Sequence, residues 1–206
     1  ELLLKELNHR TKNNMQVIIS MLRLQALQPK CAPLAFVFKE VENKIQAMAL
    51  VHRRLYQSHD LSKIDLASYI QELTELTLTS LAICQGKVNL LLDMQPVSVT
   101  IDVAIPCGLM INELMTNSLK HAFPGERRGT VKVTLKREKG ETLALVYEDD
   151  GIGVDEGFDF RNQPTLGLQT VLILGEHQLQ GKVEFASPPG FRCCLVFRET
   201  VYQARV

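Results

Sequence analysis

The spacing of apolar residues changes near residue 60, and this change limits the chain to an all-helical first part and a mixed second part. Residues 1–27 place apolar side chains three or four positions apart, or at sums of these spacings, which predicts one long amphipathic helix. Pro29 and Pro33 end this helix, and residues 34–56 repeat the pattern. Two long helices joined by a short turn predict an antiparallel hairpin.

Such a hairpin cannot bury its apolar stripe by itself. The stripe consists of Leu4, Leu7, Ile18 and Leu22 on the first helix, with Ile45 and Met48 on the second. A second copy of the chain is the natural partner, because four helices then enclose one core. We therefore expect a homodimer in which residues 1–60 form a dimeric four-helix bundle, joined through a polar stretch to a second domain of residues 61–206.

Helix and strand patterns alternate in this second domain. Helices are predicted at about residues 65–82, 103–123 and 166–179, and strands at 88–93, 130–137, 142–148, 182–186 and 192–198. Lys139-Gly140 and Ser187-Pro188-Pro189-Gly190 are turn signals between neighbouring strands. The pattern predicts an α/β sandwich with helices on one face of a mixed sheet, so the whole chain belongs to the α+β class.

The predicted helix 103–123 carries an unusual polar face. Residues 112–123 read Asn-Glu-Leu-Met-Thr-Asn-Ser-Leu-Lys-His-Ala-Phe. Helical spacing puts Glu113, Asn117 and His121 on one side, opposite apolar residues that can lie on a sheet. An amide oxygen in this position can ligate Mg²⁺. A polar helix face is more often simply solvated, however, so this motif alone is a weak signal.

A carboxylate and two glycines follow the predicted strand 142–148, in the sequence Asp149-Asp150-Gly151-Ile152-Gly153. The acid can accept a hydrogen bond from the exocyclic amine of a base, and the glycines let the backbone approach a ligand. Asp-Gly pairs are usually no more than turns. The order of the two motifs, followed by Thr165-Leu166-Gly167-Leu168-Gln169, favours a nucleotide site.

These three motifs resemble the N, G1 and G2 boxes of the nucleotide-binding domain of sensor histidine kinases, a domain related to gyrase-type ATPases and heat-shock chaperones. The resemblance implies that Asn117 ligates Mg²⁺ beside the phosphates of ATP. It implies that Asp149 accepts from the adenine amino group and that Gly151 and Gly153 allow close approach of the backbone.

The resemblance also implies roles for neighbouring residues. Lys120 and His121 would contact phosphate oxygens. Gly167, with Leu166 and Leu168 beside it, would open a helix whose free N–H groups meet phosphate. Glu113 stands where gyrase-type ATPases keep a general base for water, and in a kinase it would instead orient the metal shell or the incoming imidazole.

Residues 6–14 read Glu-Leu-Asn-His-Arg-Thr-Lys-Asn-Asn, and His9 lies off the apolar stripe. Periodicity alone gives this histidine no special status, although a solvated neutral imidazole can attack phosphorus. The stretch resembles the phosphoacceptor box of the HisKA_2 subfamily, related to the HWE histidine kinases, and residues 51–56 and 64–65 resemble its second helix and exit. The resemblance implies that ATP phosphorylates His9, and that the phosphoryl group passes to an aspartate of a response regulator receiver domain.

The sequence leaves open which group assists His9. In the commoner histidine kinases an acid follows the phosphoacceptor, whereas here Arg10 follows it. Glu6, three residues earlier, and Asn13, four residues later, both lie on neighbouring helical positions and can orient the ring.

Composition limits the classes of function that remain for this chain. The 23 basic and 23 acidic residues balance, which argues against nucleic-acid binding. No apolar run approaches the about 20 residues of a membrane span, and the odd set of five cysteines lacks metal-ligand spacing. We expect a cytoplasmic segment of a longer sensor protein, without membrane contact of its own. A non-enzymatic phosphotransfer scaffold with a degenerate ATP site, and a serine kinase of the anti-sigma type or a pure ATPase, are the alternatives.

Overall fold

The computed structural model describes residues 44–45, 47–48, 50–51, 63–80, 86–155, 157–162, 165–187 and 189–199. The chain divides into two compact units, Glu1–Gln46 and Ala47–Val206. The predicted hairpin lies outside the described residues except for six positions between 44 and 51. The hairpin, its dimeric bundle and the domain boundary at residue 60 therefore stay predictions.

The second unit is built on a five-stranded sheet, with strand order β2-β4-β5-β7-β6. The strands are β2 (Val88–Met94), β4 (Gly129–Arg137), β5 (Thr142–Asp149), β6 (Lys182–Ala186) and β7 (Phe191–Arg198). The β2–β4 pair is parallel and the other three pairs are antiparallel. The predicted mixed sheet is confirmed, including the hairpins β4–β5 and β6–β7.

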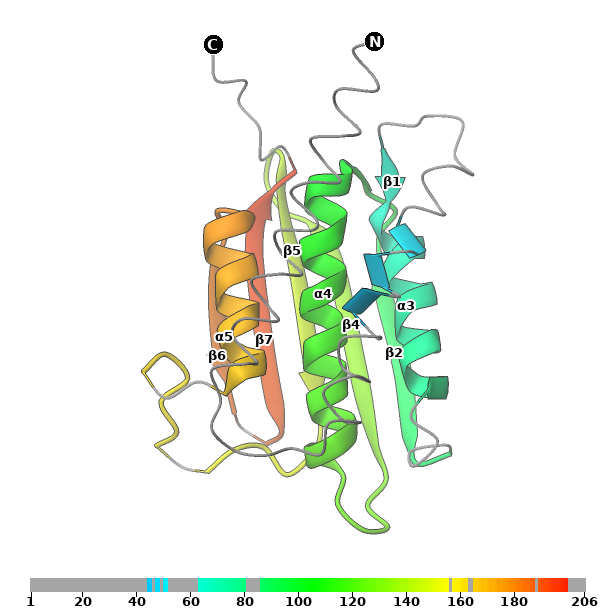
Figure 1. Cartoon of the computed structure of the whole chain (residues 1–206), viewed down its shortest axis with the longest axis vertical. Helices are drawn as coiled ribbons and strands as arrows, with labels where there is room; N and C mark the ends of the chain where they lie inside the picture. Colours follow the sequence, from blue (N-terminus) through cyan, green and yellow to red (C-terminus); the bar gives the residue numbers. More distant parts are fainter. Residues whose placement is uncertain are drawn as a thin grey trace. The chain divides into compact units, whose positions relative to one another are not determined.

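Helices α3 (Leu66–Ser80), α4 (Ile101–Asn117) and α5 (Leu166–Leu172) cover one face of this sheet (Figure 1). Two of them continue as π-helical turns, η2 (Ser118–Ala122) after α4 and η3 (Ile173–Gln178) after α5. The α/β sandwich predicted for this part of the chain is therefore confirmed.

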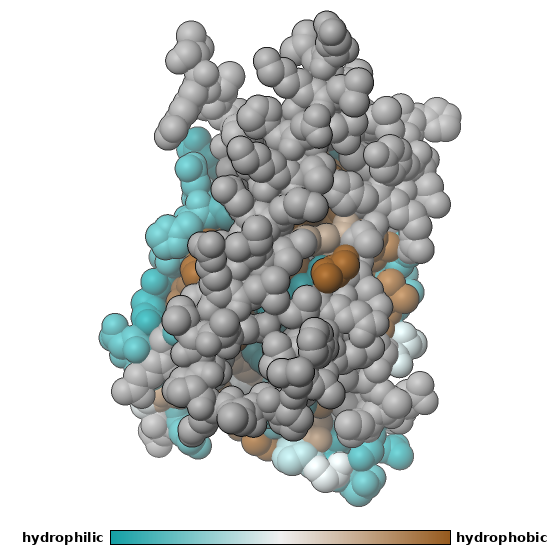
Figure 2. Space-filling view, viewed as in Figure 1, coloured by the Kyte–Doolittle hydropathy of each residue, from teal (hydrophilic) through white to brown (hydrophobic). Residues whose placement is uncertain are grey.

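Strand residues alternate between the helix-covered face and the opposite face. On β4 the inward residues are Val131, Val133 and Leu135, all buried. On β7 the buried Cys193 faces the helices, whereas Cys194 is only half-buried on the other side. Large apolar side chains are thus mostly internal, and in Figure 2 hydrophilic residues gather along the left edge and at the bottom right.

A short antiparallel pair, β1 (Ile64–Asp65) with β3 (Ser98–Val99), was not predicted. The predicted helix began at Asp65, but α3 begins one residue later. Asp65 instead accepts a hydrogen bond from Ser68 Oγ at 2.5 Å and one from the backbone N–H of Val97 at 3.3 Å. Two-residue strands carry no periodicity, so the sequence pattern could not reveal this pair.

A short segment before α3 also belongs to the second unit. Its described residues, Ala47, Met48, Leu50 and Val51, are all buried. The Tyr69 hydroxyl donates to the carbonyl oxygen of Ala47 at 3.1 Å, passing against Gly108 of α4. Among the described residues, no helix is both long and apolar enough to cross a bilayer.

Candidate functional site

Helix α4 buries every residue except Asp102, Glu113 and Asn117. It is central because it packs between α3 and α5 and against the sheet, so few of its side chains can reach solvent (Figure 1). Glu113 and Asn117 lie one turn apart at its carboxyl end, both half-buried. Glu113 and Asn117 are therefore the side chains that solvent can reach at the carboxyl end of α4.

The G2 box lies directly against these two side chains. A Cβ atom added to Gly167 would lie 2.9 Å from Asn117 Nδ2 and 3.2 Å from Glu113 Oε2. The absence of a side chain at this position is what lets α5 begin so close to α4. Thr165 caps the start of α5, since its Oγ1 accepts from the N–H of Leu168 at 3.4 Å. The G2 box therefore begins directly beside the polar residues of the N box.

Asp149 ends β5 with only 6% of its surface exposed. Its Oδ2 accepts a hydrogen bond from Ser118 Oγ at 2.5 Å, and its Oδ1 accepts from the backbone N–H of Gly151 at 2.9 Å. A carboxylate oxygen has two acceptor positions, so each oxygen keeps one for a further donor. The arrangement can receive an exocyclic amine without breaking either bond.

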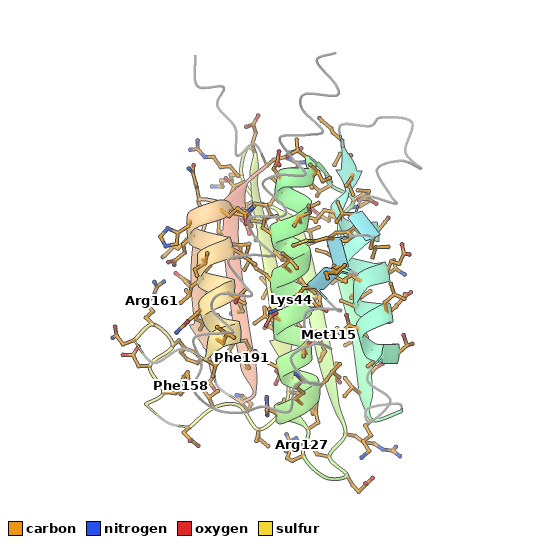
Figure 3. The ribbon with its side chains drawn as sticks, viewed as in Figure 1. Lys44, Met115, Arg127, Phe158, Arg161 and Phe191 are labelled. Carbon is orange, nitrogen blue, oxygen red and sulfur yellow. The ribbon has the colours of Figure 1, made fainter. Side chains whose placement is uncertain are left out.

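The G1 turn after Asp149 is held by hydrogen bonds and by close packing at a glycine. The N–H of Ile152 donates to the carbonyl oxygen of Ala122 at 3.0 Å. Arg127 Nη2 donates to the Asp150 carbonyl at 2.8 Å. Gly153 has φ of 69°, a conformation that favours glycine, and a Cβ there would lie 2.7 Å from Ser187 Oγ. Figure 3 shows Arg127 beyond the carboxyl end of α4, beside this turn.

The remaining predicted residues fall into three groups. Lys120 and His121 follow Asn117 in η2, half-buried and exposed respectively. In the G2 box, Leu166 is half-buried, but Leu168 has only 6% of its surface exposed and is a core residue. The proposed acceptor and its helpers, His9, Glu6 and Asn13, lie outside the described residues.

The loop between the G1 and G2 boxes is attached to the outer part of the sheet. We call residues 157–162 the lid segment. The Phe160 ring stacks on Phe185 with centroids 5.3 Å apart, and Phe158 meets Phe160 edge-on at 5.1 Å. Arg161 donates to Glu176 at 2.8 and 3.3 Å and to the Val183 carbonyl at 3.0 Å.

An open cavity of about 720 Å³ lies between the lid segment and β6. Its lining is aromatic and charged, and Figure 3 shows Phe158 and Arg161 along this loop. The Arg161 guanidinium holds the pKa of the Glu176 carboxyl below its ordinary value, through a hydrogen bond and through charge. Arg161 is therefore engaged with the protein itself in this structure.

Sequence reasoning missed several residues that hold the site together, above all Ser118, Ala122 and Arg127. Ser118 stands inside the quoted N box, directly after Asn117. Its position on the boundary between the polar and apolar faces was a signal, but a lone serine there has no recognisable partner until the strand order is known. Arg127 lies in a polar loop where an arginine carries no pattern at all.

Two family models match the chain. Residues 6–81 match the histidine kinase model HisKA_2, and residues 102–201 match the model of histidine kinase-, DNA gyrase B- and HSP90-like ATPases. Sensor histidine kinase PdtaS of Mycobacterium tuberculosis is 30% identical over 182 residues, covering 87% of this chain and 36% of that protein. The blue-light-activated histidine kinase 2 of Erythrobacter litoralis is 29% identical over 176 residues, covering 82% and 49%.

Solved structures of histidine kinases have a similar fold. A blue-light-activated histidine kinase of Erythrobacter litoralis superposes with a TM-score of 0.73 at 25% identity, covering 95% of this chain and 62% of that one. The isolated histidine kinase domain superposes with a TM-score of 0.69 at 19% identity, covering 91% and 94%. The chain spans less than half the length of these curated relatives.

Proposed function

Because the chain belongs to the histidine kinases, with a HisKA_2 segment followed by an ATP-binding domain, we propose that it phosphorylates itself on His9. The γ-phosphoryl group of ATP would be transferred to a ring nitrogen of His9 and then to an aspartate of a response regulator receiver domain. A homodimer formed through residues 1–60 is part of the proposal.

One observation carries the nucleotide half of this proposal: the N, G1 and G2 boxes converge at the open end of α4. Gly167 lies against Asn117 and Glu113, and Asp149 is connected to the same helix through Ser118. Asp149 offers acceptors to the 6-amino group of adenine, whereas the 6-oxygen of guanine is itself an acceptor and would be repelled. The geometry therefore favours ATP over GTP.

The donors at this end of α4 fit Mg²⁺. Magnesium in nucleotide sites is held by one or two protein oxygens, with phosphate oxygens and water completing its shell. Asn117 supplies an amide oxygen, and among the described residues no cluster of three or more His, Cys, Asp or Glu could hold a metal by itself. When bound, Mg²⁺ would neutralise charge on the phosphates. Glu113 would orient its water shell or the incoming imidazole, and Lys120 and His121 would contact phosphate oxygens.

Phosphoryl transfer needs positioning and charge neutralisation more than covalent work by the protein. The neutral imidazole of His9 supplies the attacking nitrogen. Its second ring nitrogen carries a proton and becomes cationic as the phosphorus–nitrogen bond forms. An acceptor beside it, the Glu6 carboxylate or the Asn13 amide oxygen, would stabilise this charge and fix the ring.

The test is incubation of the whole chain with γ-labelled ATP and Mg²⁺, followed by analysis of the label's stability. We expect label that is labile in acid and stable in base, as a phosphohistidine is, and no label on His9→Gln, which has no nucleophilic ring nitrogen. His9→Gln should still bind ATP. Acid-stable label would instead indicate a hydroxyl acceptor, and ATP binding without any label would indicate a scaffold.

A further inference from the structure

Asp149 is held from two different elements, and one of the two bonds comes from a residue to which no role has been given. Resting on the proposed ATP site, we propose that Ser118 is a positioning residue that fixes the Asp149 carboxylate for the 6-amino group of the purine. Ser118 does not itself touch the nucleotide in this proposal. It acts through the 2.5 Å hydrogen bond from its Oγ to Asp149 Oδ2.

A single bond would leave the carboxylate free to turn. The N–H of Gly151 holds Oδ1, but it lies only two residues along the chain and moves with the same turn. Ser118 belongs to η2, on the helical layer, and holds the other oxygen. With one oxygen tied to the turn and one to the helix, the plane of the carboxylate is set, and its free acceptor positions have a fixed direction.

The position of Ser118 is determined by the segment η2. It is the first residue of η2 and follows Asn117 directly. The last residue of η2, Ala122, accepts from the N–H of Ile152 in the G1 turn. The π-helical turn is therefore joined to the G1 turn at both ends. Consequently, Asn117, proposed to hold the metal, and Asp149, proposed to bind the base, are joined through Ser118.

The Tyr147 hydroxyl is a second buried polar group near Ser118 and Asp149. It is almost completely buried, two residues before Asp149 on the helix-facing side of β5. Ser118 and the charge of Asp149 are the polar groups that act on it, yet it has no hydrogen-bond partner within normal distance among the described residues.

The experiment compares two nucleotides on the whole chain by calorimetry with Mg²⁺: ATP, and purine riboside triphosphate, which lacks the 6-amino group. Ser118→Ala should raise the Kd for ATP by about tenfold, because the hydrogen bond from the 6-amino group to a misoriented Asp149 carboxylate is weakened. It should change the Kd for purine riboside triphosphate by no more than about twofold, because that ligand makes no such bond. Ser118→Ala should have no further effect on ATP binding in an Asp149→Asn background.

The chain offers a matched control. Ser68 Oγ donates to Asp65 at the same 2.5 Å, at the start of α3 and away from the site. Ser68→Ala removes an equivalent Ser–Asp bond and should leave both Kd values unchanged. If Ser118→Ala does not fold, Ser118→Cys keeps the volume with a weaker donor and should still weaken ATP binding selectively.

Two results would overturn the inference while leaving the proposed function intact. In one, Ser118→Ala binds ATP as tightly as the wild type. In the other, it loses both nucleotides equally, or loses as much in the Asp149→Asn background, so that the serine has only a structural role. Failure of the wild-type chain to bind either nucleotide would contradict the proposed function instead.

Discussion

The two sides of the candidate nucleotide site are held by different kinds of contact. One side, which we call the inner frame, comprises residues 117–122 and 149–153, joined by short hydrogen bonds from a serine hydroxyl and from backbone N–H groups. The lid segment is held by half-buried aromatic rings and by the Arg161–Glu176 ion pair. Buried hydrogen bonds resist opening, whereas exposed ion pairs contribute little. We infer a preformed inner frame and a lid that opens at low cost.

The largest effect should come from Asn117, the proposed metal ligand of the inner frame. Asn117→Ala removes an amide oxygen proposed to hold Mg²⁺, and should lower the rate of autophosphorylation at limiting Mg²⁺ by at least about 100-fold. Because the side chain is half-exposed at the end of α4, the melting temperature should stay within about 2 °C of the wild type. Full autophosphorylation by Asn117→Ala would show that Asn117 is an ordinary surface residue.

A pair of glycines tests the difference in rigidity directly. Gly153 in the inner frame and Gly157 in the lid segment both have positive φ, 69° and 84°. A Cβ at Gly153 would meet Ser187 Oγ at 2.7 Å and the Gly190 carbonyl at 2.9 Å, whereas at Gly157 nothing lies within 4 Å. Gly157→Ala therefore incurs only the backbone penalty of about 1–2 kcal/mol, and Gly153→Ala about 2–4 kcal/mol with the added crowding.

Urea unfolding of the two variants measures this difference. Equal losses of unfolding free energy would mean that the inner frame yields as readily as the lid, and the comparison between the two sides would fail. A matched alanine variant at Gly140, which also has positive φ of 71° and open space around it, should behave like Gly157→Ala.

How far the sequence could predict this structure depended on the length of each pattern. The strands β4 and β5 and the buried face of α4 were predicted because apolar residues recur over many positions, as in Val131, Val133 and Leu135. The pair β1–β3 was too short to leave such a pattern. Within the site, the box residues were predicted by resemblance, but the bonds from Ser118 and Arg127 were not. Those bonds cross between segments that meet only after folding, so no local spacing records them.

The next largest effect should come from the residue proposed to recognise the base. Asp149→Asn replaces the charged acceptor for the adenine amine by an amide, and should weaken ATP binding by about 1.5–3 kcal/mol. The loss should be smaller for GTP, which offers no 6-amino group. Asp159 in the lid segment is a suitable control, since its carboxylate accepts from the neighbouring lid residues Arg161 and Asn162. Calorimetry that finds equal ATP affinity for Asp149→Asn and the wild type would refute the assignment.

The smallest effect should come from the ion pair that holds the lid. Arg161 keeps the pKa of Glu176 below its ordinary value, so the folded chain releases this proton more readily than the unfolded chain. The resulting stabilisation is present above the ordinary glutamate range and is lost as pH falls through the lower pKa of the folded state. Arg161→Ala should therefore be slightly less stable than the wild type at neutral pH, and the difference should shrink as the pH falls through the pKa of Glu176 in the folded state.

The local consequence of this substitution should exceed its global one. Without Arg161, the bonds to Glu176 and to the Val183 carbonyl disappear, and the lid segment keeps its aromatic contacts and the backbone bond from Phe158 to Asp155. Limited proteolysis should cut Arg161→Ala faster within the lid segment, with the protease chosen so that it does not cleave at arginine or lysine. Lys182→Ala removes a more exposed ion pair of the neighbouring strand, to Glu184 at 2.6 Å, and should not change the cutting rate. Identical cutting of Arg161→Ala and the wild type would mean that the ion pair does not restrain the lid, and that the aromatic cluster alone distinguishes the two sides of the site.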